Sequence, residues 1–103
     1  MVIEYDDFID FCKSLIDRQI PTIGKRSYFT VVSVNVDRIE YKLSTGKLRY
    51  TEKVRIQKVL DTYENTHSLK VADYNDFTWA SSYTLPLVIL YLKNKGESEA
   101  DFL

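Results

Sequence analysis

The residues of this chain that could do chemistry are cations gathered in its middle third. Residues 25–58 contain nine basic and three acidic side chains, a net charge of +6, although the whole chain has a net charge of −1. Both ends are acidic, with a net charge of −3 over residues 1–24 and −4 over residues 59–103. Because lysine and arginine neutralise phosphates, we expect the middle third to attract an anionic polymer. The candidate nucleic-acid-binding residues are Lys42, Lys47, Arg49, Lys53, Arg55 and Lys58.

Catalytic and metal-binding residue types are sparse. The chain has one cysteine, Cys12, and one histidine, His67. Cys12 falls on the apolar stripe of a predicted helix, where a thiol behaves as a small hydrophobe, and His67 falls in a predicted loop as a surface or capping residue. Two such residues do not make a zinc site without carboxylates, and three isolated glycines do not make a phosphate-binding loop. We therefore expect a protein that is not an enzyme and that needs no metal or cofactor.

Two β-strands are expected ahead of most of these cations. Residues 28–34 are rich in β-branched and aromatic side chains, and their irregular alternation indicates either that both faces are covered or that a bulge lies near Ser33. Residues 38–43 alternate charged and apolar side chains, as a half-buried strand does. The segment 35–37 is read as the turn between the two strands.

A third strand and a helix carry the remaining candidates. A turn at residues 44–46 leads to a short strand at 47–50, in which Leu48 and Tyr50 are expected to face the core and Arg49 to face outward. Thr51 is the expected N-cap of the helix that follows. Val54 falls on the outer side of that helix, where it either packs against a later helix or is exposed. The helical spacing predicts a buried face made of Ile56, Val59, Leu60 and Tyr63.

These assignments distribute the cations over two surfaces. Arg38, Lys42 and Arg49 are expected to project from one sheet face, whereas Arg55 and Lys58 share a flank of the helix. If the helix covers the other sheet face, the cations form two patches, which weakens the case for a single nucleic-acid footprint. The alternative is a solvated surface on which glutamates at positions 40 and 52 are the local partners.

The rest of the chain is read as mostly helical. Residues 4–18 carry apolar side chains at helical spacing, and residues 69–74 suit a short helix. Phe77 and Trp79 are expected in an irregular segment at the edge of the core. Residues 83–93 are read as a buried helix that begins near Leu85, since Pro86 is tolerated in a first helical turn; a strand is the alternative.

The fold class is therefore α+β: an N-terminal helix, a three-stranded antiparallel meander, and then two or three helices packed on one sheet face. Residues 1–93 are expected to form a single domain, and residues 94–103 a frayed tail. The eight tyrosines are attributed mainly to core and rim packing. One cysteine, an acidic N-terminus and no long apolar run indicate a cytoplasmic protein, which we take to be prokaryotic or from a phage.

A series of apolar and turn positions runs through roughly residues 20–92: Thr22, Phe29-x-Val31-x-x-Val34, Ile39, Ser44-x-Gly46 with a basic run into a helix, Leu69, Asp73, and Ser82-Tyr83 before an apolar segment. This order of elements resembles a small module found beside nuclease domains in bacterial restriction-type proteins. The resemblance implies assistance in DNA recognition, and it implies no cutting activity because no nuclease motif accompanies it.

Two functional hypotheses follow. The first is a small non-enzymatic nucleic-acid-binding accessory module that contacts phosphates through the central basic stretch. The second is a protein–protein interaction module, such as an adaptor or a phage-type inhibitor of a host system, acting through its acidic ends or an exposed aromatic surface. Pairing through the edge of the short third strand leaves a homodimer open.

Overall fold

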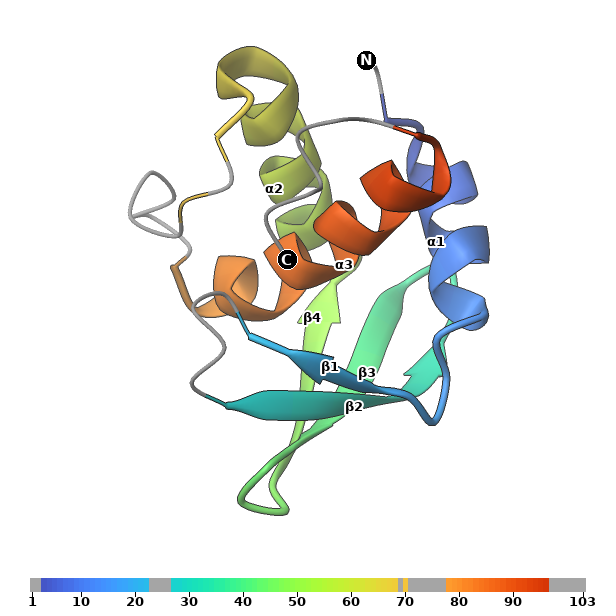
Figure 1. The fold of residues 1–103 in the computed structure, drawn as a ribbon, viewed down its shortest axis with the longest axis vertical. Coiled ribbons are helices and arrows are strands. Elements are labelled where there is room, and N and C mark those ends of the chain that lie inside the picture. Colours follow the sequence, from blue (N-terminus) through green and yellow to red (C-terminus); the bar gives the residue numbers. More distant parts are fainter. Residues whose placement is uncertain (1–2, 23–26, 69, 71–77, 97–103) are drawn as a thin grey trace.

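The structure is a computed structural model that describes residues 3–22, 27–68, 70 and 78–96 of the chain. It is an α+β fold in which a four-stranded antiparallel sheet has the strand order β1-β2-β3-β4. The described helices lie together on one side of that sheet (Figure 1). In chain order the elements are α1 (Tyr5–Lys13), β1 (Gln19–Pro21), β2 (Tyr28–Val34), β3 (Arg38–Leu43), β4 (Leu48–Glu52), α2 (Lys53–Thr66) and α3 (Thr78–Asn94).

The N-terminal helix is shorter than its apolar spacing predicted, and a fourth strand follows it. Helix α1 ends at Lys13, and Asp17 takes the left-handed conformation (φ 70°) while its N–H donates to the carbonyl of Val31 at 2.7 Å. This reversal leads into β1, in which Ile20 pairs with Phe29 of β2. Leu15 is still buried, which explains why the apolar spacing continues past the end of the helix. The prediction of three strands was therefore wrong by one short edge strand.

Of the two alternatives for residues 28–34, the structure shows the bulge near Ser33. The register between β2 and β3 shifts between Val31 and Ser33, which leaves Val32 42% exposed on the outer side of the sheet. Val31 stays in the core, and Val34 packs against the core from the other side of the shift. The turn that follows is held by Asn35, whose Oδ1 accepts hydrogen bonds from the backbone N–H groups at 37 and 38.

Strand β4 faces the opposite way from the prediction. Leu48 is 69% exposed and Tyr50 is 45% exposed, whereas Thr51 is only 1% exposed. Thr51 pairs with Ile39 on the core face of the sheet, and its Oγ1 lies 2.9 Å from the hydroxyl of Tyr41. Thr51 is thus a strand residue and not a helix cap. The N-cap is Glu52, which makes no side-chain capping bond.

Helix α2 buries the face that the sequence predicted, and Val54 is exposed at 67%. The helix continues through Thr66, where a loop was expected, and ends at His67. That residue takes the left-handed conformation (φ 55°) and donates its N–H to the carbonyl of Tyr63. His67 therefore acts as a C-cap, and its ring stacks on the Tyr63 ring with 5.4 Å between centroids.

Helix α3 is longer than expected and carries a proline inside it. It starts at Thr78, so Trp79 belongs to the helix and not to an irregular segment, and Pro86 lies well past the first turn. The alternative of a strand at 83–93 is excluded. Because residues 84–89 are all buried, packing outweighs the cost of an internal proline. The short helix expected at 69–74 and Phe77 lie outside the described residues, apart from Lys70.

The core is closed by aromatic contacts between helices and sheet. Phe11, which lies off the main apolar stripe of α1, packs edge-on against Tyr91 of α3 with ring centroids 5.6 Å apart.

Of the tail expected from residue 94, residues 94–96 are described, and Lys95 Nζ lies 3.2 Å from an Asp7 carboxylate oxygen. None of the helices within the described residues is long and apolar enough to cross a bilayer.

Candidate functional site

Strand β4 forms one of the two edges of the sheet, and no strand within the described residues pairs with its outer side. The N–H of Leu43 donates to the carbonyl of Lys47 at 2.8 Å, which fixes the hydrogen-bond alternation of the β3–β4 hairpin. Antiparallel alternation then directs the backbone N–H and C=O groups of Arg49 and Thr51 toward β3. The corresponding groups of Leu48 and Tyr50 are directed away from the sheet. The edge therefore presents main-chain donors and acceptors beside two exposed apolar side chains.

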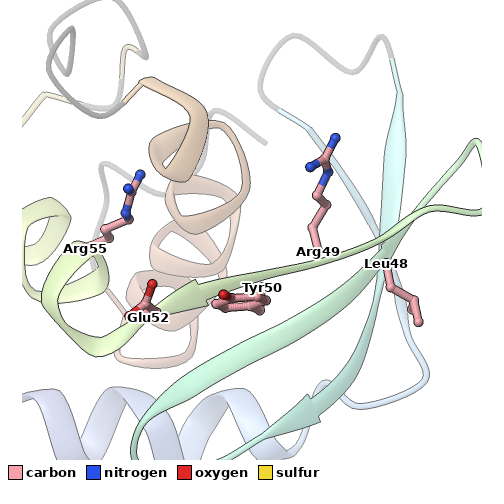
Figure 2. A pocket seen from close by; sticks show the side chains of 5 residues that line it. All are labelled: Leu48, Arg49, Tyr50, Glu52 and Arg55. Carbon is pink, nitrogen blue, oxygen red and sulfur yellow. The ribbon is translucent and has the colours of Figure 1, made fainter.

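A cavity of about 360 Å³ runs along this edge and is lined by Leu48, Arg49, Tyr50, Glu52 and Arg55 (Figure 2). Leu48 and Tyr50 belong to the outer face of the sheet, whereas Arg49 belongs to the face that the helices cover. A hollow that touches side chains of both faces lies along the strand edge. Figure 2 shows Arg49 and Arg55 pointing to the same side of β4, with Tyr50 and Glu52 between them.

Two of the six candidate cations line this hollow and two more lie close to them along the chain, and we call these four the β4-edge cations. Lys47 lies in the turn just before β4, Arg49 lies on β4, and Arg55 lines the same hollow from α2. Lys58 follows Arg55 by three residues and lies beside it on the same flank of the helix. All four are exposed, and Glu52 is the one acid among the described residues that lines the hollow.

The other two candidates lie elsewhere. Lys42 pairs with Leu48 across β3 and β4, so it projects from the outer sheet face. Lys53 lies two residues before Arg55, which places it about 200° around the helix on the opposite flank. There its Nζ lies 4.9 Å from the centroid of the Tyr5 ring. The structure therefore does not bring Lys42 and Lys53 to the β4 edge.

Arg49 lies on a different face from the one predicted. It pairs with Tyr41, whose side chain is in the core, so it leaves the outer face that Arg38 and Lys42 share. Burial raises the pKa of Tyr41 to about 12, while the hydrogen bond from Thr51 and the charge of Arg49 oppose that rise.

The groups that could act as nucleophile or metal ligand have other roles. Cys12 is fully buried in α1, and burial raises the pKa of its thiol. Asp7 accepts a hydrogen bond from the Tyr91 hydroxyl and lies beside Lys95, and both hold the pKa of its carboxyl below the usual value. Over the described ranges, no three His, Cys, Asp or Glu side chains are grouped so that they could hold a metal ion.

Sequence reasoning expected cations on the outer face of the sheet but did not place Tyr28 and Tyr50 there. Tyr28 and Tyr50 are each 45% exposed there, whereas Tyr5, Tyr41, Tyr63 and Tyr91 are buried as expected of core residues. The signal that would have found Tyr28 is the alternation with its buried neighbour Phe29. For Tyr50 the signal is the length of the preceding turn, which sets the register of β4.

Comparisons with known proteins add no relative to this geometry. No protein-family model matches the chain, and neither the curated proteins nor the solved structures contain a significant match to it.

Proposed function

We propose that this protein is a small non-enzymatic nucleic-acid-binding module that contacts phosphates through the β4-edge cations. The observation that carries the proposal is that Arg49 of β4 and Arg55 of α2 line one hollow at the strand edge, with Lys47 two residues before Arg49 and Lys58 three residues after Arg55. Guanidinium groups suit phosphate because their planar fork donates two parallel hydrogen bonds. Glu52 limits how deeply an anion can enter, so the contacts are expected at the rim of the hollow, where both guanidinium groups point.

Salt dependence gives the proposal a magnitude. Each phosphate neutralised by a cation contributes about −0.9 to the slope of log affinity against log salt for a duplex, and about −0.7 for a single strand. Four cations acting together therefore give a slope of roughly −3 to −4. Lys53, which lies over Tyr5 on the opposite flank of α2, is expected to contribute nothing to that slope.

The experiment is fluorescence anisotropy of a labelled single strand and a labelled duplex, each titrated at several salt concentrations. Arg55→Gln is expected to weaken binding and to reduce the slope by about one phosphate contact. Lys53→Gln is the matched control, because it makes the same charge change on the same helix. Salt-independent binding, or equal losses from both variants, would contradict the proposal, and no binding even at low salt would remove it.

A protein partner is the second candidate, and it is favoured by the outward-facing backbone groups of Leu48 and Tyr50. An unpaired strand edge with exposed apolar side chains is a template for an added strand, which a partner protein or a second copy of this chain would supply. Sedimentation at increasing protein concentration tests the second copy. Leu48→Lys is expected to abolish any dimer formed through this edge, whereas a dimer that persists in the variant would use another surface.

A further inference from the structure

Within the described residues, the outer face of the sheet is open across all four strands. Backbone pairing aligns Gln19, Thr30, Lys42 and Leu48 in one row on this face, one residue from each strand. The described helices lie on the other side (Figure 1). Two aromatic rings, those of Tyr28 and Tyr50, are about half exposed on this open face.

A second hollow, of about 380 Å³, lies on the part of this face nearest the β3–β4 turn. The residues that line it include an aromatic residue, Tyr28, a cationic residue, Lys42, and the polar residues Gln19, Thr30 and Ser44. Among the residues that the structure describes, no carboxylate contributes to that lining. The hollow therefore combines a flat aromatic wall, hydrogen-bonding groups and one cation, which is the chemistry that recognises a nucleobase and its phosphate.

The charge pattern of the face separates this hollow from the rest of the sheet. Toward the other end of the strands, Glu40 lies 3.7 Å from the guanidinium of Arg38 and accepts a hydrogen bond from Ser33. The glutamate there is compensated locally. No Asp or Glu is among the described residues that line the hollow beside Lys42. A ligand that matches the charge of this hollow therefore carries an anionic group.

The two exposed tyrosines and Lys42 lie on one diagonal across the sheet. Tyr28 is two residues before Thr30, which pairs with Lys42, and Tyr50 is two residues after Leu48, which also pairs with Lys42. At ~4.8 Å between strands and ~6.8 Å per two residues along a strand, the tyrosines are ~17 Å apart. That distance is roughly five stacked nucleotides at ~3.4 Å each.

The diagonal leads to the β4 edge. Tyr50 also lines the hollow that contains Arg49 and Arg55. The guanidinium of Arg38 lies 4.8 Å from the centroid of the Tyr50 ring, so it covers one face of that ring. The residue remains 45% exposed, which leaves ring surface for a second planar group. Tyr50 therefore joins the aromatic diagonal of the open face to the hollow that Arg49 and Arg55 line.

We propose that the hollow beside Tyr28 is a nucleobase site and that the ligand is a single-stranded nucleic acid. Its bases stack on Tyr28 and Tyr50, Lys42 binds a phosphate between them, and the strand continues to Arg49 and Arg55. A duplex keeps its bases stacked on one another and offers no free base face to a tyrosine on an open sheet. This proposal rests on the proposed function and adds the strandedness of the ligand and the residues that select it.

The test is fluorescence anisotropy with a labelled oligothymidylate and with a duplex of the same length. Tyr28→Ala and Tyr50→Ala are each expected to weaken single-strand binding by roughly 5- to 150-fold without changing its salt slope, because stacking releases no counterions. Tyr28→Phe and Tyr50→Phe should retain binding. Val32→Ala is the matched control, since Val32 is exposed on the same face and is not aromatic.

The outcomes separate this inference from the proposed function. If neither oligonucleotide binds at low salt, both fail. If both bind, and Arg55→Gln weakens them while the tyrosine variants bind like the wild type, the β4-edge function stands and the base site is wrong. Duplex binding as tight as single-strand binding would also overturn the base site. Circular dichroism melts of every variant show that a lost affinity does not come from a lost fold.

Discussion

Removing the hydrogen bond between Tyr41 and Thr51 is expected to lower the free energy of unfolding by an amount that can be worked out from the structure. Both residues are 1% exposed, and their hydroxyl oxygens are 2.9 Å apart. Thr51→Val replaces the hydroxyl with a methyl group of similar shape, so the packing is kept and the Tyr41 hydroxyl loses its partner. An unsatisfied buried hydroxyl costs about 1–3 kcal/mol. For a chain of this size, that corresponds to a fall in Tm on the order of 10 °C.

A double-mutant cycle distinguishes this cause from simple loss of packing. Tyr41→Phe alone leaves the Thr51 hydroxyl unsatisfied, but Tyr41→Phe combined with Thr51→Val removes both polar groups. The double variant is therefore expected to be more stable than the two single losses predict, by about 1 kcal/mol or more.

The assay is urea unfolding followed by circular dichroism, with Thr51→Ser as the control that keeps the hydroxyl. Strictly additive losses, or a Thr51→Val variant as stable as the wild type, would refute the reasoning.

Three further predictions concern the turn, the helix contacts and alkaline pH. Gly46 has φ +93°, and apart from its own atoms and those of its two chain neighbours no atom lies within 4 Å of the place that a Cβ would take, so Gly46→Ala should cost about 1–2 kcal/mol from backbone strain, measured as a lower urea midpoint. Because the pKa of Asp7 is lower in the folded chain than in the unfolded chain, its carboxylate stabilises the fold at pH values above the ordinary carboxyl pKa, and this stabilisation is lost as the pH falls through the pKa of the folded state. Asp7→Asn should therefore make the free energy of unfolding less dependent on pH below about pH 4. The pKa values of Tyr5 and Tyr41 are raised to about 12, so stability should hold below about pH 10 and fall between pH 10 and 12, and Tyr41→Phe should lessen that fall in urea midpoints measured across this range.

Local patterns predicted the elements that are long and regular. Helix α2 was found because Ile56, Val59 and Leu60 recur at helical spacing, and the bulge in β2 was found because the alternation of Val31, Val32 and Val34 does not fit a regular strand. Strand β1 was missed because three residues ending in Pro21 are too few to show a period. It is held by pairing with β2, which is a tertiary contact.

The types of the candidate cations were predictable, but their grouping was not. Arg49 was assigned to the outer face because its neighbours Leu48 and Tyr50 are apolar and were expected in the core. A one-residue change in register moves every side chain of a strand to the other face, so this one assignment decided which cations share a surface. Lys53 and Arg55 were both named as candidates, although their two-residue spacing puts them on opposite flanks of α2; the contact with Tyr5 shows which of the two flanks faces α1.

The length of the turn before β4 nevertheless predicts the register of that strand. The bond between the Leu43 N–H and the Lys47 carbonyl closes a loop of residues 44–46, with Gly46 in the positive-φ position that such a hairpin requires. Counting from that pair puts Arg49 opposite Tyr41, on the core face. Turn geometry is thus a stronger guide to the facing of a short strand than the apolar character of its side chains.

The inverted strand also explains how a buried polar contact and an exposed functional surface arise together. Placing Leu48 and Tyr50 in the core would bury two large side chains, each worth about 1.5–3 kcal/mol, so the observed register forgoes a sizeable hydrophobic gain. It is compatible with a stable core because Tyr41 satisfies the hydroxyl of Thr51, the residue that is buried instead. The consequence is that the side chains of Leu48 and Tyr50 lie on the open sheet face and that Arg49 points to the same side of β4 as Arg55 (Figure 2). A single turn and a single buried hydrogen bond therefore position both the aromatic diagonal and the β4-edge cations, and a variant that shifts this register should lose both surfaces at once.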